Sequence, residues 1–243
     1  MIASLGMYDR PETAASNDAL WAGIRKNLGY GPLHLDRTTT PMQVWQSPDL
    51  LFSQTCGMPY RSILRDSVQL IGTPDYGLSD VPVGYYYSVF VVRRDAENVL
   101  EAYKDRLFAY NEAISQSGWA APQIHAHKMG FQFENILCSG GHLASAAAVA
   151  NRQADIAALD VISWLYIEEY EGFAKHLKVI QTTAPTPGLP FITAAGRDVD
   201  QIYDAVALAI DRLLPVHRDI LRLTGIVHIG SDTYLNVATP ARP

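Results

Sequence analysis

The chain has 243 residues, of which 48% are apolar and 18% are charged, and its formal net charge is −6. A chain of this size is typical of one large or two small globular domains, and it buries about 70–75% of its unfolded surface without help from disulfides or metals. The acidic balance and the absence of a basic run argue against nucleic-acid binding. The sequence has no nucleophile elbow, P-loop or zinc-ligand pattern, so we predict no cofactor and no metal.

Two further features concern the cellular compartment. The first residues contain neither the basic segment nor the long apolar segment of a signal peptide. No apolar run approaches the about 18–20 residues of a transmembrane helix, so we expect a chain that does not span the membrane. Either it works in the cytoplasm or its leader is absent from this sequence. Cys56 and Cys138 lack metal-ligand spacing and are predicted to be two free thiols.

The N-terminal third alternates between short apolar runs and one amphipathic helix. The helix is predicted to start at Pro11 and to end at Gly29, because proline favours the first turn and glycine the position after the last. A short helix or loop near residue 42 and a helical turn near residue 61 are also expected. Strands are predicted over residues 2–8, 33–36, 49–55 and 68–74. This alternation is typical of a doubly wound α/β fold.

The middle of the chain reads as a second α/β lobe inserted into the first. Strands are predicted over residues 85–93, 107–110, 155–163 and 177–183, and helices over residues 95–104, 141–152 and 164–173. Two of the strands, near Tyr87 and near Val179, are long enough to cross between lobes, and a proline-rich break follows the second. We therefore predict that residues 1–84 and 184–243 form lobe I and that residues 85–183 form lobe II. A ligand cleft between two such lobes is the plan of a hinged binding protein.

The C-terminal part is predicted to return to the first lobe. Residues 191–193 form a strand, and a helix then begins at Asp198, which together with Gln201 resembles a capping box. A last helix is expected from residue 217 to residue 224, and residues 234–243 are expected to form a tail.

Two polar, glycine-containing turns each follow an apolar strand and open a helix, at residues 111–118 and 139–142. Free N–H groups and the helix dipole make such a turn a site for an oxyanion. No Lys or Arg lies between residues 107 and 127, so hydroxyls and amides would hold the anion. The residues assigned to this site are Ser115, Gln116, Ser117 and Gly118. The alternative is that Ser and Gly are turn formers only.

Two other polar residues stand at helix starts in the predicted second lobe. His142 opens a helix, where the dipole disfavours the charged imidazolium, but a neutral imidazole can still donate one N–H to an anion. Asp160 ends a strand that would face the cleft. The alternatives are a structural histidine and a carboxylate that caps the next helix.

Three weaker candidates are Tyr8, Thr55 and Tyr87. The first two end predicted strands, where open α/β sheets bind ligands, and the third lies on a crossing strand. For each of them a purely structural role is the alternative. His125 and His127 are two residues apart, which is weak as a metal pair, and we expect solvated loop residues there.

In their order and spacing, the two polar turns and the strands and helices around them resemble those of the substrate-binding proteins of phosphate- and phosphonate-type ABC transporters. Residues 115–118 match that family's Ser-Thr-Ser-Gly turn, and residues 139–142 match its Ser-Gly-Ser-His turn. The resemblance extends over residues 50–193 and is looser at both ends. It also includes the helix end Val149-Ala150-Asn151, the Ala-Asp-rich strand at 154–160, and Tyr87-Ser88-Val89 with Val91-Val92-Arg93.

The resemblance implies the two-lobed type II periplasmic-binding-protein fold. It also implies a small anionic ligand such as phosphate or phosphonate, an ABC-transporter permease as partner, and a periplasmic location. Asp160 matches a ligand position of the family. Gln116 replaces the usual Thr, which allows a ligand of a different size. Leu143 stands where some aminophosphonate binders carry an acid, which argues against an amine-bearing ligand.

Two other interpretations remain open. The first is a cytosolic enzyme on the same fold, similar to leaderless proteins of menaquinone or thiamine biosynthesis, in which His142 or Asp160 would act as an acid or base. The second is a ligand-sensing module that acts on a protein partner. The missing leader favours the enzyme, whereas the motifs favour a non-catalytic binding protein, which is the function we predict.

Overall fold

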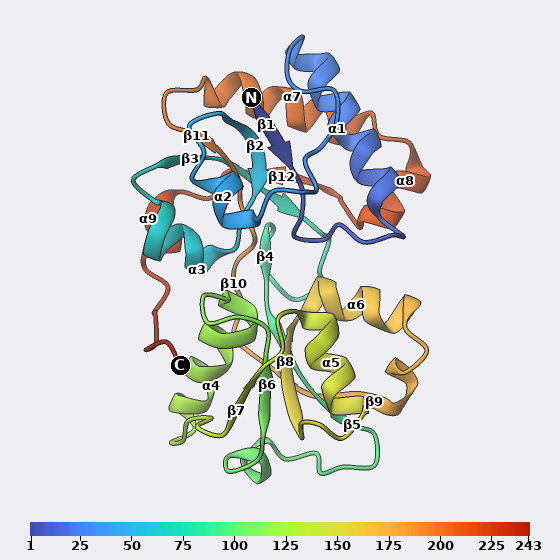
Figure 1. Cartoon of the computed structure of the whole chain (residues 1–243), viewed down its shortest axis with the longest axis vertical. Helices are drawn as coiled ribbons and strands as arrows, with labels where there is room; N and C mark the ends of the chain where they lie inside the picture. Colours follow the sequence, from blue (N-terminus) through green and yellow to red (C-terminus); the bar gives the residue numbers. More distant parts are fainter. The chain divides into compact units, whose positions relative to one another are not determined.

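A computed structural model describes residues 1–243, which divide into two compact units (Figure 1). The first comprises Met1–Tyr85 and Pro187–Asn236, and the second comprises Tyr86–Thr186 and Val237–Pro243. The first boundary between the units, after Tyr85, falls one residue later than the sequence predicted. The second boundary, after Thr186, falls three residues later. One part of the expected division was wrong, because the last seven residues belong with the second unit rather than the first.

The first unit is built on a five-stranded sheet with the order β1-β2-β11-β3-β12. The strands β1 and β2 are parallel, β11 lies antiparallel between β2 and β3, and β12 pairs antiparallel with β3. Every residue of β2 is buried, as the continuous apolar run predicts for a central strand. The strands are β1 (Ile2–Ser4), β2 (Leu50–Gln54), β3 (Val68–Asp75), β11 (Phe191–Ala194) and β12 (Gly225–Val227).

Seven helical segments accompany this sheet. The long helix α1 ends at Gly29, whose φ of 80° is left-handed, and α7 starts at Asp198, whose side chain accepts the Gln201 N–H as predicted. The segments are α1 (Ala14–Leu28), α2 (Pro41–Trp45), α3 (Gly57–Pro59), the π-helical turn η1 (Tyr60–Leu64), α7 (Val199–Asp211), α8 (Pro215–Leu221) and α9 (Ser231–Leu235).

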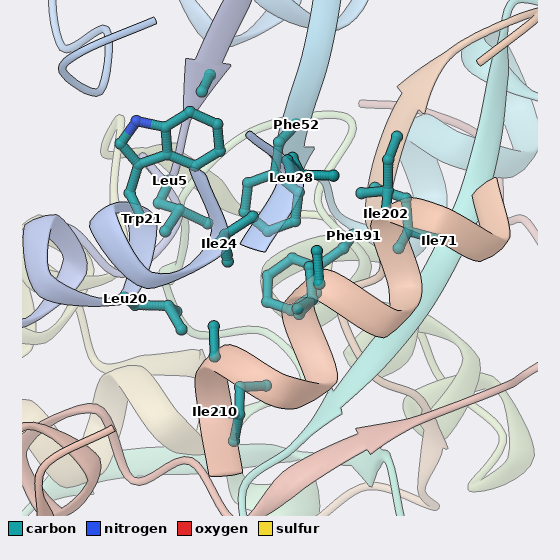
Figure 2. Close-up of a cluster of buried hydrophobic side chains, with 14 of the residues drawn as sticks. Leu5, Leu20, Trp21, Ile24, Leu28, Phe52, Ile71, Phe191, Ile202 and Ile210 are labelled. Atoms are coloured by element: carbon teal, nitrogen blue, oxygen red, sulfur yellow. The ribbon is translucent and has the colours of Figure 1, made fainter. Parts of the chain in front are cut away.

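The main core of the first unit lies between this sheet and the helices α1 and α7, which pack against each other (Figures 1 and 2). Phe52 of β2 is its centre, with ring centroids 5.9 Å from Trp21 and 4.9 Å from Phe191. Each large apolar side chain buried in this way stabilises the fold by about 1.5–3 kcal/mol. The other labelled members are Leu5, Leu20, Ile24, Leu28, Ile71, Ile202 and Ile210.

The second unit has its own five-stranded sheet, with the order β7-β6-β8-β5-β9. The strand β6 is parallel to both β7 and β8, and β5 is antiparallel to β8 and β9. The carboxyl ends of β6, β7 and β8 therefore share one edge of the sheet. The strands are β5 (Ser88–Arg93), β6 (Phe108–Tyr110), β7 (Ile136–Cys138), β8 (Ile156–Asp160) and β9 (Leu177–Thr182).

Each of the three parallel strands leads into a helix. The helical segments of this unit are η2 (Leu100–Tyr103), the π-helical turn η3 (Gln116–Ala120), α4 (Ala121–Lys128), α5 (His142–Ala150), α6 (Val161–Tyr170) and η4 (Ala174–His176). A two-stranded ladder of β4 (Tyr85–Tyr86) and β10 (Thr186–Pro187) lies where the chain passes between the units. The strands near Tyr87 and Val179 that were predicted to cross between the lobes are β5 and β9, and both lie within the second unit. No helix is both long and apolar enough to cross a bilayer.

Several predicted elements differ from the structure. No strand forms at residues 33–36, and directly after them the Asp36 carboxylate accepts the amides of Thr38 and Thr39 and turns the chain. The predicted helix over residues 95–104 is only the short η2, and Val99 just before it is 56% exposed. The strand predicted to run to residue 163 ends at Asp160. The strand β12 and the helix α9 were not predicted.

The cysteine prediction is confirmed, whereas the prediction that His125 and His127 lie in a loop was wrong, because both lie on α4 and only His127 is exposed. Cys56 is buried in the first unit, Cys138 is exposed in the second, and both are free. His125 lies on α4 rather than in a loop, with its ring centroid 5.4 Å from that of Phe90 and its Nε2 2.9 Å from the Gln181 amide.

Candidate functional site

The predicted oxyanion turn follows β6 and opens a continuous helical segment. Ser115 is its N-cap, and the Ser115 Oγ accepts the Gly118 N–H at 3.0 Å. Helical bonding starts one turn later, with the Ala120 N–H donating to the Ser115 carbonyl at 3.0 Å. The Ser115 hydroxyl and the Gly118 amide are thus bonded to each other. This bond shapes the turn. Of the two serine hydroxyls, only that of Ser117 contacts a residue outside the turn.

Glycine at position 118 is required by close packing rather than by an unusual φ. A Cβ at Gly118 would fall on the Oδ1 of Asn111, the residue that follows β6. Asn111 Oδ1 is buried and has no hydrogen-bond partner. Asn111 was not among the predicted site residues, although a polar residue directly after a buried parallel strand was the signal that could have found it.

The second turn is tied to the first by its backbone. The amides of Ser139 and Gly140 donate to the carbonyls of Tyr110 and Asn111 at 2.8 and 3.0 Å. The Ser139 Oγ lies 2.7 Å from the Oγ of Ser145 and 3.1 Å from the Tyr110 carbonyl. These bonds fix where α5 begins, and they engage the Ser139 hydroxyl within the protein.

The two turns meet in one hydrogen bond. The Ser117 Oγ lies 2.9 Å from the Nε2 of His142, the first residue of α5. Burial lowers the pKa of His142 from 6.5 to about 4, so the imidazole is neutral at pH 7. The residue as a whole is only half-buried, whereas its Nδ1 atom is buried and has no partner. The site therefore pairs a hydroxyl with a neutral imidazole at the starts of two helices.

The third helix start, after β8, is capped by Asp160. This residue is 2% exposed, and its carboxylate accepts the Ser163 N–H at 2.9 Å. Beside it, the Tyr87 carbonyl accepts the Val161 N–H at 3.2 Å. Helix capping was the predicted alternative to ligand binding for Asp160. The two roles are compatible, because a carboxylate that caps a helix can still accept a further hydrogen bond.

The second unit thus brings most of the predicted residues to one edge of its sheet, at the ends of β6, β7 and β8 and the start of β5. No Lys or Arg is among them. They are Tyr87, Ser115, Gln116, Ser117, Gly118, His142 and Asp160.

The two remaining candidates lie in the first unit. Tyr8 follows β1 and Thr55 follows the parallel strand β2, so both lie beyond the carboxyl ends of neighbouring strands. Tyr8 makes an edge-to-face contact with Tyr76, with ring centroids 5.5 Å apart. Thr55 is 0% exposed, and its Oγ1 has no hydrogen-bond partner. An orphaned buried hydroxyl is unusual in a folded protein.

A small cavity of about 220 Å³, which was not predicted, lies at this edge of the first unit. Ser4 and Gln54, from the ends of β1 and β2, are among its lining residues. Its only basic residue, Arg37, is held by Asp9 at 2.6 Å and by Asp18 at 2.8 Å. Two carboxylates therefore neutralise the one cation of this cavity.

A comparison with protein families identifies the relatives of this chain. Residues 52–223 match the family model for the periplasmic substrate-binding protein of the phosphonate ABC transporter. The chain belongs to this family. The family consists of binding proteins rather than enzymes, and the resemblance noted in the sequence is confirmed. No curated protein matches the chain by sequence.

Solved structures show that the fold is that of two-lobed periplasmic binding proteins. PhnD1 from Prochlorococcus marinus, in complex with methylphosphonate, superposes with a TM-score of 0.77 at 16% identity, covering 97% of this chain and 94% of its own. A binding protein component of an ABC phosphonate transporter from Pseudomonas aeruginosa gives 0.71 at 16% identity, covering 96% and 83%. XAC2383 from Xanthomonas citri, bound to chloride, gives 0.67 at 18% identity, covering 96% and 93%.

Proposed function

We propose that this chain binds a small tetrahedral oxyanion, phosphate or a phosphonate, as the substrate-binding protein of an ABC-type transport system. The observation that carries the proposal is the 2.9 Å pair of Ser117 Oγ and His142 Nε2 at the starts of two helices. A periplasmic location and a membrane permease as partner belong to the same proposal, and family membership supports both.

The anion is held by dipoles and one hydroxyl rather than by cations. A buried N–H without an acceptor is rarer than a buried acceptor without a donor. The unpartnered Nδ1 of His142 therefore favours the tautomer with the proton on Nε2. In that tautomer Nε2–H donates to Ser117 Oγ, and the Ser117 hydroxyl is free to donate to the anion. The amides at the start of the helix provide further donors.

Asp160 gives the site a preference among oxyanions. A carboxylate can only accept hydrogen bonds, so at this edge it favours a ligand that still carries an O–H, such as monohydrogen phosphate or a monoprotonated phosphonate. Sulfate has no such proton at neutral pH and is disfavoured. We assign no catalytic role to Asp160 or His142, because the members of the family bind rather than transform their ligands.

Calorimetry with methylphosphonate, phosphate and sulfate tests this function. A hydrogen bond to a charged group contributes about 1.5–3 kcal/mol, so Ser117→Ala is expected to weaken phosphate or phosphonate binding by about 10–150-fold. The matched control is Ser62→Ala, which removes a hydroxyl bonded to the Met58 carbonyl in the first unit and leaves affinity unchanged. Affinity should vary little with salt, because no Lys or Arg contributes.

Three outcomes would contradict the assignment. The first is that no oxyanion binds the wild type at millimolar concentration, the second is that Ser117→Ala binds as tightly as the wild type, and the third is that sulfate is preferred over phosphate. Tyr8 and Thr55 stay predictions, and the same titration on Tyr8→Phe and Thr55→Val checks them.

A further inference from the structure

A second cavity lies in the second unit, away from the oxyanion edge. Its volume is about 600 Å³, within the range of about 300–1,000 Å³ that is usual for small-molecule sites. One wall comes from the helix α4 and the strand β7, and the other is the final segment of the chain, residues 238–243. Its apolar lining includes Trp119, Ile124, Phe133, Ile136, Pro240 and Ala241.

The aromatic walls of this cavity are held in place by the protein. The Trp119 Nε1–H donates to the Ala241 carbonyl at 2.9 Å, which joins the two walls. The Gln123 side chain bonds both the carbonyl and the amide of Phe133, at 2.8 and 3.1 Å. The Phe133 ring stacks on that of Phe108 with centroids 4.3 Å apart. A ligand would therefore meet an ordered apolar surface.

Of the charged side chains that line this cavity, Lys and Arg outnumber Asp and Glu by two to one. Lys128 and Arg242 both line it, and neither forms an ion pair. Glu134 is the only acidic side chain of the lining. An anionic group on the ligand would be favoured near these two cations, whereas the rest of the cavity requires an apolar body.

We propose that this cavity is a second ligand site, which takes a small aromatic or aliphatic molecule with one anionic group. Trp119 is the only residue that it shares with the helical turn of the oxyanion site. The proposal goes beyond the transport function and does not depend on it, because none of the predicted oxyanion contacts lines the cavity.

A matched pair of fluorescent probes tests the site. Anilinonaphthalene sulfonate and N-phenyl-1-naphthylamine share one apolar body, but only the first carries an anion. Both are titrated into the full chain in the presence of excess methylphosphonate, so that the sulfonate does not report on the oxyanion site. The wild type is expected to bind both, with the sulfonate favoured. Lys128→Gln and Arg242→Gln should each reduce that preference by about two- to fivefold, the usual size of an exposed charge interaction.

Filling the cavity separates it from other apolar surfaces. Ile136→Trp places a bulky ring in the cavity and is expected to weaken both probes by about tenfold or more, a loss of at least about 1.4 kcal/mol. Val216→Trp is the matched control, because Val216 is 57% exposed on α8 in the first unit. If Ile136→Trp does not fold, Ile124→Trp fills the same space from α4. The proposal is overturned if the wild type binds neither probe at micromolar concentration, or if the filled variant binds as the wild type does.

Discussion

The neutral state of His142 is expected to make the stability of the second unit depend on pH. Burial lowers the pKa of His142 from 6.5 in the unfolded chain to about 4. Between these values the unfolded chain binds a proton that the folded chain does not. The contribution of His142 to the free energy of unfolding is therefore complete above about pH 6.5, and it is lost as the pH falls from there through about 4.

The size of the effect follows from the two pKa values. Between pH 7.5 and pH 4.5 the linkage relation gives a loss of about 2.5 kcal/mol for pKa values of 6.5 and about 4. Because His142 is only half-buried, water screens part of this difference, and we expect about 1.5–2.5 kcal/mol. His142→Gln keeps an amide donor near Ser117 but cannot titrate, so this part of the pH dependence should be absent from the variant.

Urea unfolding at both pH values, followed for the wild type and His142→Gln, measures the difference. The wild type should lose about 1.5–2.5 kcal/mol more than the variant on going from pH 7.5 to 4.5. A histidine NMR titration of the folded protein checks the cause, since the His142 ring signals should not shift until the pH is well below 6. The reasoning is refuted if His142 titrates near 6.5, or if both proteins lose the same stability.

Three further predictions concern packing, thiol exposure and capping. Gly118→Ala should lower the free energy of unfolding by about 1–3 kcal/mol, because the new Cβ meets the Asn111 side chain. Adding Asn111→Ala should recover much of that loss in thermal or urea unfolding, and equal stability of Gly118→Ala and wild type would disprove the contact. A thiol reagent should modify Cys138 in the native protein and Cys56 only after unfolding, and rapid labelling of both would contradict their difference in exposure. Asp198→Ala should cost about 1 kcal/mol by removing the cap of α7, and an unchanged unfolding midpoint would show that the cap contributes nothing.

Local sequence signals predicted the parts of the fold that depend on local chemistry. Gly29 ended its helix because glycine adopts the left-handed conformation without cost, and Asp198 started another because its carboxylate reaches an amide three residues on. The continuous apolar run of β2 identified a central strand. The signal failed at residues 33–36, where no strand forms and the Asp36 side chain bonds the amides of Thr38 and Thr39 in a turn.

For the candidate site, the sequence by itself determined which residue types stand at strand ends and helix starts, and so the neutral, hydroxyl-rich character of the turn at residues 115–118. Only the tertiary structure decided which of these groups are engaged within the protein. The Ser115 hydroxyl is bonded within its own turn, whereas that of Ser117 meets His142, 25 residues further along the chain. The final segment likewise packs on the second unit through Trp119. Such pairings depend on strand order and on burial, which bring distant residues together, and no local pattern in the sequence encodes them.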